Sequence, residues 1–156
     1  MKTTLILTGR TVGRQFQELI DDYAGRITHY MPFGIVVIPE LKQTKNLSEQ
    51  QQKQKEGELI LRQLQPSDTV VLLDEHGQER RSVDFAKWLS QKQQNSRHLV
   101  FVIGGPYGFS EDVYSRANEK ISLSRMTFSH QMVRTIFTEQ LYRACTIQRG
   151  EPYHHE

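Results

Sequence analysis

The sequence predicts a single α/β domain over residues 1–156, built on a mainly parallel β-sheet. Two apolar runs without polar alternation, at residues 69–73 and 99–103, are typical of parallel strands that are buried on both faces. Strand-like and helix-like segments alternate along the whole chain, as expected when helices cover both faces of such a sheet. No internal repeat or linker interrupts this alternation.

The N-terminal part supplies two predicted strands and two predicted helices. Residues 4–8 are apolar and β-favouring, and residues 12–27 then carry apolar side chains at helical spacing. Residues 33–38 form a second short apolar run between two prolines, which indicates a strand with defined ends. The Ser-Glu-Gln-Gln sequence at 48–51 has the form of a capping box and predicts a helix that runs to residue 65.

The C-terminal part continues the alternation. A strand at 68–74 is followed by a turn and by a helix that contains Trp88. After the strand at 99–103, the Ser-Glu-Asp sequence at 110–112 has the form of a helix cap with an acidic first turn. Residues 121–123 are a short strand candidate, and residues 129–148 form a last helix with one apolar stripe.

Composition is that of an ordinary globular protein, with 37% apolar residues, 24% charged residues and a net charge of +2. So small a charge neither requires nor excludes a nucleic-acid partner, because the distribution of charge decides this. No stretch approaches the ~20 apolar residues of a membrane span, and the first apolar run is too short for a signal peptide. We therefore expect a cytoplasmic protein without a membrane partner. With Cys145 as the only cysteine and no metal-ligand spacing, we expect neither an intramolecular disulfide nor a metal site.

Three predicted strand ends offer a place for a ligand, because ligands of open parallel sheets bind beyond the carboxyl ends of the strands. These ends are residues 72–74, 104–108 and 123–128. The glycines after the 99–103 strand do not match the dinucleotide pattern G-x-G-x-x-G, and no phosphate-loop Lys follows them. An oxidoreductase is therefore disfavoured. By itself the glycine turn has two readings, a ligand contact or a tight structural turn.

The last helix and the tail carry the other candidate residues. Arg143 either forms a surface salt bridge with Glu139 at i, i+4 or contacts RNA, and the spacing alone favours the salt bridge. The histidines at 154–155 either belong to a polar tail or serve the chemistry. These residues do not by themselves name a reaction.

Several segments taken together are more specific than any one of them. In this order along the chain they are Val-Leu-Leu-Asp-Glu-His-Gly at 71–77, Phe-Val-Ile-Gly-Gly-Pro-Tyr-Gly-Phe at 101–109, Ser-Leu-Ser-Arg-Met-Thr-Phe-Ser-His-Gln-Met-Val-Arg at 122–134, Glu-Gln-Leu-Tyr-Arg-Ala at 139–144 and Pro-Tyr-His at 152–154. The whole chain resembles the RlmH family, the pseudouridine N3-methyltransferases of large-subunit ribosomal RNA in the SPOUT class. The resemblance implies a parallel α/β sheet with a C-terminal trefoil knot, a homodimer, and S-adenosylmethionine bound at the knot.

The resemblance also implies which residues contact the cofactor. Backbone groups would read the edge of the adenine while apolar side chains pack on its faces, and any side chain on the two glycines would enter that space. The implied contacts are Leu72, Leu73, Gly104, Gly105, Leu123, Ser124, Arg125, Met126, Thr127 and Phe128.

The implied substrate is a pseudouridine of 23S ribosomal RNA in the assembled ribosome. Methylation of N3 requires loss of its proton, so we expect Arg143 to stabilise charge on the base and His130 or His154 to assist proton removal. Tyr153 would orient the base. Two alternatives remain: a ribosome-associated factor that binds the cofactor without catalysis, and a SPOUT methyltransferase acting on another RNA.

Overall fold

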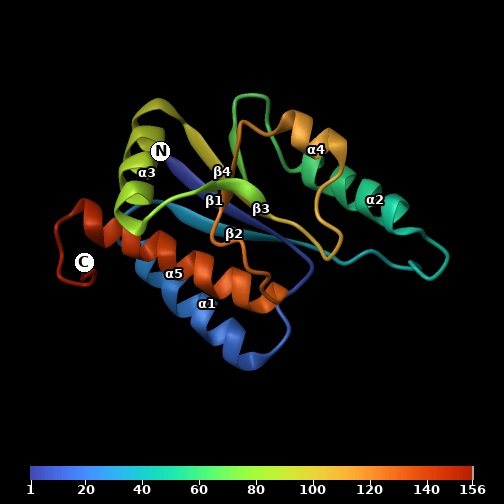
Figure 1. Cartoon of the computed structure of the whole chain (residues 1–156), viewed down its shortest axis with the longest axis horizontal. Helices are drawn as coiled ribbons and strands as arrows, with labels where there is room; N and C mark the ends of the chain where they lie inside the picture. Colours follow the sequence, from blue (N-terminus) through green and yellow to red (C-terminus); the bar gives the residue numbers. More distant parts are fainter. Residues whose placement is uncertain (156) are drawn as a thin grey trace.

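The computed structural model, which describes residues 1–155, contains a five-stranded sheet in the order β2-β1-β4-β3-β5 (Figure 1). Every neighbouring pair of strands is parallel, which confirms the predicted α/β class. The strands are β1 (Lys2–Thr8), β2 (Phe33–Ile38), β3 (Thr69–Glu79), β4 (His98–Ile103) and β5 (Glu119–Ser122).

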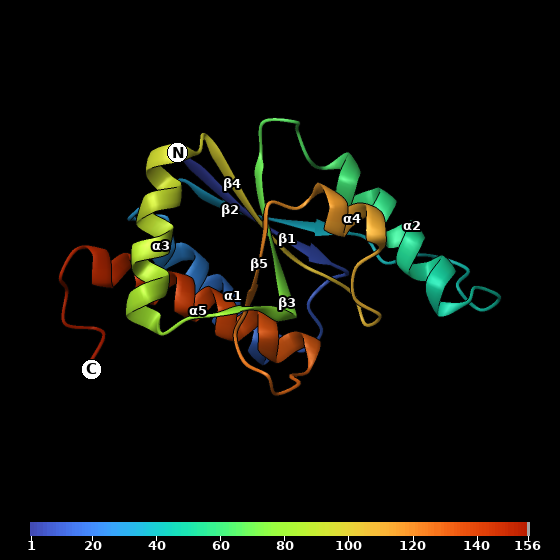
Figure 2. The same ribbon diagram turned by 45° about the horizontal axis from the view of Figure 1, so that its top comes forward.

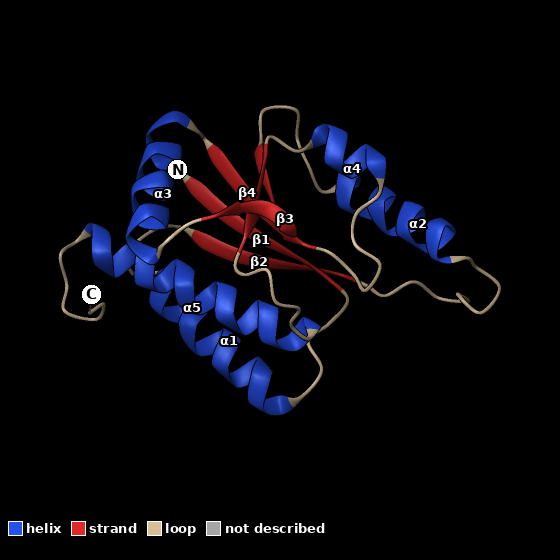
Figure 3. Cartoon of the chain, viewed as in Figure 1, coloured by secondary structure: helices blue, strands red, loops and turns tan. Residues whose placement is uncertain are grey.

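Helices cover both faces of the sheet (Figure 3). On one face lie α1 (Arg14–Ile27), α3 (Ser82–Asn95) and α5 (His130–Gln148), with α5 packed between the other two. On the opposite face lie α2 (Glu49–Arg62) and the short α4 (Glu111–Arg116), which pack against each other (Figure 2).

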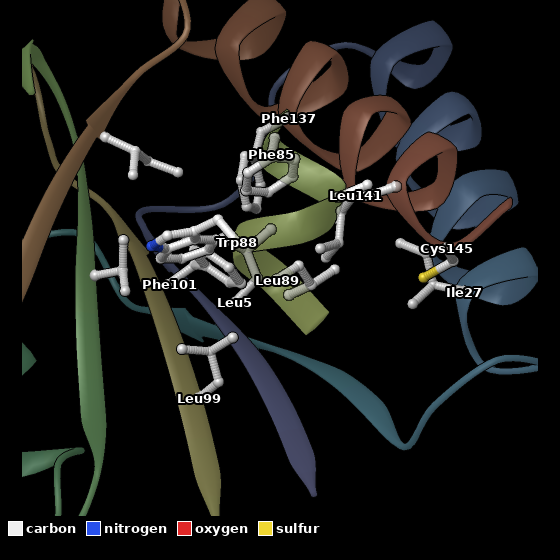
Figure 4. Packing of buried hydrophobic residues seen from close by; sticks show 14 of the residues in the cluster. Leu5, Ile27, Phe85, Trp88, Leu89, Leu99, Phe101, Phe137, Leu141 and Cys145 are labelled. Atoms are coloured by element: carbon white, nitrogen blue, oxygen red, sulfur yellow. The ribbon is translucent and has the colours of Figure 1, made fainter. Parts of the chain in front are cut away.

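Side chains on the two faces of the central strand β4 pack into two different hydrophobic cores. The strand therefore lacks polar alternation. Phe101 packs on the α3 and α5 side, where its ring centroid lies 4.9 Å from that of Phe137 (Figure 4). Val100 and Val102 belong to the second core, under α2 and α4. Cys145 is buried in the first core, and burial raises the pKa of its thiol to about 12. It behaves as a small apolar core residue.

Local sequence signals correctly predicted where α2, α4 and α5 begin. Ser48 accepts a hydrogen bond from the Gln51 amide, and the Gln51 side chain accepts one from the Ser48 amide, which completes the predicted capping box. The Ser110 and Ser129 hydroxyls cap α4 and α5 by accepting from the amides of Val113 and Met132, without a reciprocal side-chain bond. The end of α2 was predicted less well, because the helix stops at Arg62 and only turns follow it.

Strand β3 differs from the prediction, since it continues beyond the expected turn at 76–77 as far as Glu79. Ile121 of β5 pairs both with Leu73 and with Gln78, so the intervening residues bulge out and the chain then returns to the same neighbour. Gly77 packs directly on the backbone of β5 at this crossing. A Cβ atom there would lie 2.6 Å from the carbonyl carbon of Ile121. The trefoil knot itself stays a prediction.

Replacement of Gly77 by alanine should destabilise the protein, because the atoms that block its Cβ are backbone atoms that cannot rotate away. We expect a loss of about 1–3 kcal/mol. In a thermal unfolding experiment, each kcal/mol would lower the midpoint by roughly 2–4 °C at this size. Gly34→Ala is the control, because a Cβ on this strand glycine meets no atom within 4 Å. Equal melting temperatures for the two variants would contradict the close contact between Gly77 and the backbone of β5.

Candidate functional site

A cavity of about 1000 Å³ lies at the carboxyl edge of the sheet, where the three predicted strand ends meet. Leu73 and Asp74 contribute from β3, residues 103–109 from the end of β4 and the turn after it, and residues 122–124 and 126–128 from the end of β5 and the loop after it. Since parallel strands all end at this edge, segments far apart in the sequence line one cavity.

Neighbouring side chains pack closely against the glycine turn after β4. The Gly108 amide donates to the Gly105 carbonyl, and Gly108 has a φ of 81°, a conformation that favours glycine. A Cβ on Gly104 would lie 2.9 Å from the ring of Phe109. A Cβ on Gly105 would collide with Oε1 of Glu56 and lie 2.9 Å from its Oε2. The expectation that these side chains would enter cofactor space is thus corrected, because the Cβ atoms would first meet protein.

The loop between β5 and α5 supplies five of its six expected residues to the cavity. The loop is shaped from within, because the Ser122 hydroxyl donates to the Ser124 carbonyl and the Met126 amide donates to the Ser124 hydroxyl. Met126 is 75% exposed. The five lining residues are Leu123, Ser124, Met126, Thr127 and Phe128.

Two expected cofactor residues lie elsewhere. Arg125 points to a separate hollow beside Gly77, where it forms an exposed ion pair with Glu79 at 2.9 Å. Leu72 is fully buried in the core under α2 and α4. Its side chain therefore packs the sheet, while its neighbour Leu73 reaches the cavity.

His130, in the first turn of α5, is the one expected catalytic residue that lines the cavity. Burial and the nearby positive charge of Arg134 lower the pKa of its imidazole. A lowered pKa keeps the ring neutral at physiological pH, so His130 is able to accept a proton.

Sequence reasoning missed the wall formed by the start of α2. Ser48, Glu49, Gln50 and Lys53 all line the cavity, although their polar pattern reads as a solvated helix face. It also missed Tyr114, whose hydroxyl donates to the Asp74 carboxylate across the cavity edge. No local pattern marks such contacts, because they depend on how α2 and α4 pack.

The remaining expected catalytic residues form a second cluster around Glu139. Arg143 donates to Oε1 of Glu139 at 2.5 Å, and the Tyr153 hydroxyl donates to the same oxygen at 2.9 Å. The Arg143 guanidinium lies over the Tyr153 ring, and its Nη1 donates to Nδ1 of His154 at 3.2 Å. The hydrogen bonds to Glu139 raise the pKa of Arg143, which is therefore a permanent cation. Arg143 therefore forms the salt bridge with Glu139 and also contacts Tyr153 and His154.

The tail that carries this cluster is tied to α1. The Tyr30 hydroxyl donates to Oε2 of Glu151 at 2.5 Å, and this bond raises the pKa of Tyr30 to about 12. Arg149 lies over the Tyr30 ring, with its guanidinium carbon 4.6 Å from the ring centroid. Residues 149–154 are thus part of the folded structure.

The two groups of expected catalytic residues lie at opposite ends of α5. His130 opens the helix and Arg143 lies thirteen positions later, a distance of roughly 20 Å along the helix axis. The tail at 149–155 follows the end of α5 that lies far from the cavity (Figure 1). One chain therefore does not bring His130 and Arg143 to the same reacting atom.

Among residues 1–155, no helix combines the length and apolar character needed to cross a membrane. In the same range, no group of three or more His, Cys, Asp or Glu side chains is arranged to hold a metal ion.

A parallel sheet with a cavity at its carboxyl edge, lined in part by a glycine turn, is typical of α/β proteins that bind an organic ligand there. A family model described as "Predicted SPOUT methyltransferase" matches residues 1–154. The chain therefore belongs to the SPOUT methyltransferase family, and its curated relatives place it in the RlmH group within that family.

Those relatives match over full length. "Ribosomal RNA large subunit methyltransferase H" of Bacteroides fragilis is 62% identical and covers 100% of both chains. The protein of the same name from Flavobacterium johnsoniae is 56% identical, again over 100% of both. Among solved structures, the SpoU methyltransferase AviRb from Streptomyces viridochromogenes is 12% identical with a TM-score of 0.48, covering 96% of this chain and 61% of its own.

Replacement of Gly105 by alanine should weaken binding of S-adenosylmethionine, the cofactor of these methyltransferases, by tenfold or more, roughly 1.4 kcal/mol. The physical reason is that the new methyl group must displace either the Glu56 carboxylate or the glycine turn. Isothermal titration calorimetry would measure the change. Gly25→Ala is the control, because its Cβ would meet no atom within 4 Å outside its own helix. Unchanged affinity in Gly105→Ala would show that the turn does not hold the cofactor.

Proposed function

We propose that this methyltransferase transfers a methyl group from S-adenosylmethionine to N3 of a pseudouridine in large-subunit ribosomal RNA, within the cytoplasmic ribosome. The observation that carries the proposal is the 56–62% identity, over essentially the whole chain, to proteins named as methyltransferases of that RNA. The cavity at the sheet edge supports it, because it provides the matching ligand site.

The residues of the cavity fit the cofactor. Its volume of about 1000 Å³ is at the upper end of the range for small-molecule sites, which leaves room for a base beside the cofactor. Leu73, Leu123 and Phe128 offer apolar surface for a flat ring, and the glycine turn offers backbone groups. When bound, the cofactor supplies an electrophilic methyl group on a positively charged sulfur.

The chain's own residues then supply positioning and acid–base chemistry. His130 lines the cavity and is neutral at physiological pH, so it would accept the N3 proton of the base. Arg143 would stabilise the negative charge that remains on the base. Tyr153 is positioned beside Arg143 by Glu139 and would orient the base.

A homodimer reconciles these roles with the distance between the ends of α5. If two α5 helices lie antiparallel about a twofold axis, the Arg143 cluster of one chain approaches the cavity of the other. Exposed apolar side chains near the start of α5 support such an interface: Val12 is 58% exposed and Met132 is 41% exposed, close to the exposed Met126. The Val12 amide donates to the side chain of Gln131, which fixes this loop against α5.

We expect the protein to recognise the shape of the assembled ribosome as well as RNA phosphates, because its own net charge is small. With a net charge of +2 the protein has little electrostatic attraction for a free RNA stem-loop, whose binding depends on phosphate neutralisation. The assembled ribosome offers additional surface.

The reaction can be tested with labelled S-adenosylmethionine and ribosomes from a strain that lacks the enzyme. We expect label on N3 of one pseudouridine in 23S RNA, located by mass spectrometry, and little label on naked RNA. Arg143→Ala should lose at least roughly 100-fold in rate, the scale of one charge-stabilising donor. Arg14→Ala is the control, because it also removes the arginine of an i, i+4 ion pair, with Glu18, but one that is exposed on α1.

Three other outcomes would change the proposal. Cofactor binding without any label would favour a ribosome-associated factor. Label on transfer RNA alone would favour another substrate. Efficient methylation of naked 23S RNA would remove the requirement for the ribosome.

Mixed dimers test the shared site. A variant with a damaged cavity, Gly105→Ala, and a variant with a damaged tail end, Arg143→Ala, would be unfolded together and refolded as a mixture. If each site combines both chains, half of the dimers are mixed and each holds one intact site, so about a quarter of wild-type activity should return. Activity no greater than the average of the two separate variants would place each site within one chain.

A further inference from the structure

Glu56 on α2 is a buried carboxylate that the reaction described above does not use. Its side chain is 6% exposed, and its Oε1 receives no hydrogen bond from any described residue. No ion pair joins it to a cationic side chain within residues 1–155. A buried charge without a cationic partner is costly, so its position calls for a physical reason.

The carboxylate lies directly behind the glycine turn that walls the cavity. Because Gly105 has no side chain, Glu56 approaches the turn so closely that a Cβ on Gly105 would collide with Oε1. The next residue, Gly57, makes an equally close contact, since its Cβ would collide with the hydroxyl of Ser110 at the end of the same turn. Two glycines thus allow α2 to place a carboxylate against the 104–110 segment, with only backbone between it and the cavity.

Burial leaves little solvent around Glu56 to screen its charge when the carboxyl group is ionised. Burial raises the pKa of the carboxyl group, partly offset by a hydrogen bond from Gln52, and a cationic ligand nearby would favour the ionised form. Other acidic groups of the cavity wall are weaker sources of field. Glu49 and Glu75 are exposed to solvent, and Asp74 already accepts hydrogen bonds from Tyr114 and from the His76 amide.

We propose that Glu56 is a specificity-determining residue that favours the positively charged cofactor over its uncharged product. S-adenosylmethionine carries a positive sulfonium, whereas S-adenosylhomocysteine, which remains after methyl transfer, has a neutral thioether. An unscreened carboxylate behind Gly105 stabilises the first and not the second, because charges interact strongly in a medium of low dielectric constant. The same preference assists replacement of spent product by fresh cofactor. This inference rests on the proposed use of S-adenosylmethionine.

The test is the ratio of two dissociation constants, for S-adenosylmethionine and for S-adenosylhomocysteine, measured by calorimetry on the full-length protein. Glu56→Gln keeps the size of the side chain and removes its charge. We expect it to weaken binding of S-adenosylmethionine by roughly three- to tenfold and to leave S-adenosylhomocysteine nearly unchanged. Glu58→Gln is the matched control, because it removes an exposed charge from the same helix outside the cavity and should alter the ratio much less.

A second variant guards against a folding defect. Glu56→Asp keeps the charge while shortening the side chain, so it should preserve most of the wild-type ratio even where both affinities fall. Equal weakening of both ligands in Glu56→Gln, or an unchanged ratio, would overturn this inference while leaving the methyltransferase function intact. Wild-type protein that bound neither ligand would overturn the proposed function, and this inference with it.

Discussion

The contact of Gly77 with the backbone of β5 is the constraint on which the site depends. Residues 74–77 leave the sheet and return to the same neighbour, so two chain segments cross with backbone on backbone. This crossing fixes where β3 delivers Leu73 and where the loop at 122–128 begins. Two of the segments that line the cavity therefore take their position from one place at which no side chain fits.

Buried polar groups tie the remaining elements to this frame. Arg134 of α5 is almost completely buried and donates to the Thr8 carbonyl at 2.7 Å and to the Thr11 hydroxyl at 3.1 Å. It thus fastens the start of α5 to the end of β1, next to the cavity. The same guanidinium contributes to keeping His130 neutral, so one residue serves both the fold and the electrostatics of the site.

The sequence predicted those features that local chemistry determines. The buried strands at 69–73 and 99–103, the capping box at Ser48 and the apolar stripe of α5 were all read correctly. The second half of β3 was missed, because its pairing depends on β5, which lies some forty residues later in the chain. The α2 wall was missed for the same reason: its polar residues face a cavity that exists only after folding. The loop at 123–128 was identified as a strand end able to line a ligand site, and only the family resemblance assigned it to the cofactor.

The length of α5 has a consequence for how this protein can evolve. The helix joins His130 at the cavity to Arg143 at the tail through an unbroken run of turns, with Phe137 and Leu141 in the core between them. Insertion or deletion of one residue in this run would turn one end by about 100° relative to the other. Substitutions on the exposed side can accumulate, but changes of length cannot be absorbed. The number of residues between His130 and Arg143 is therefore constrained, whichever amino acids occupy the positions between them.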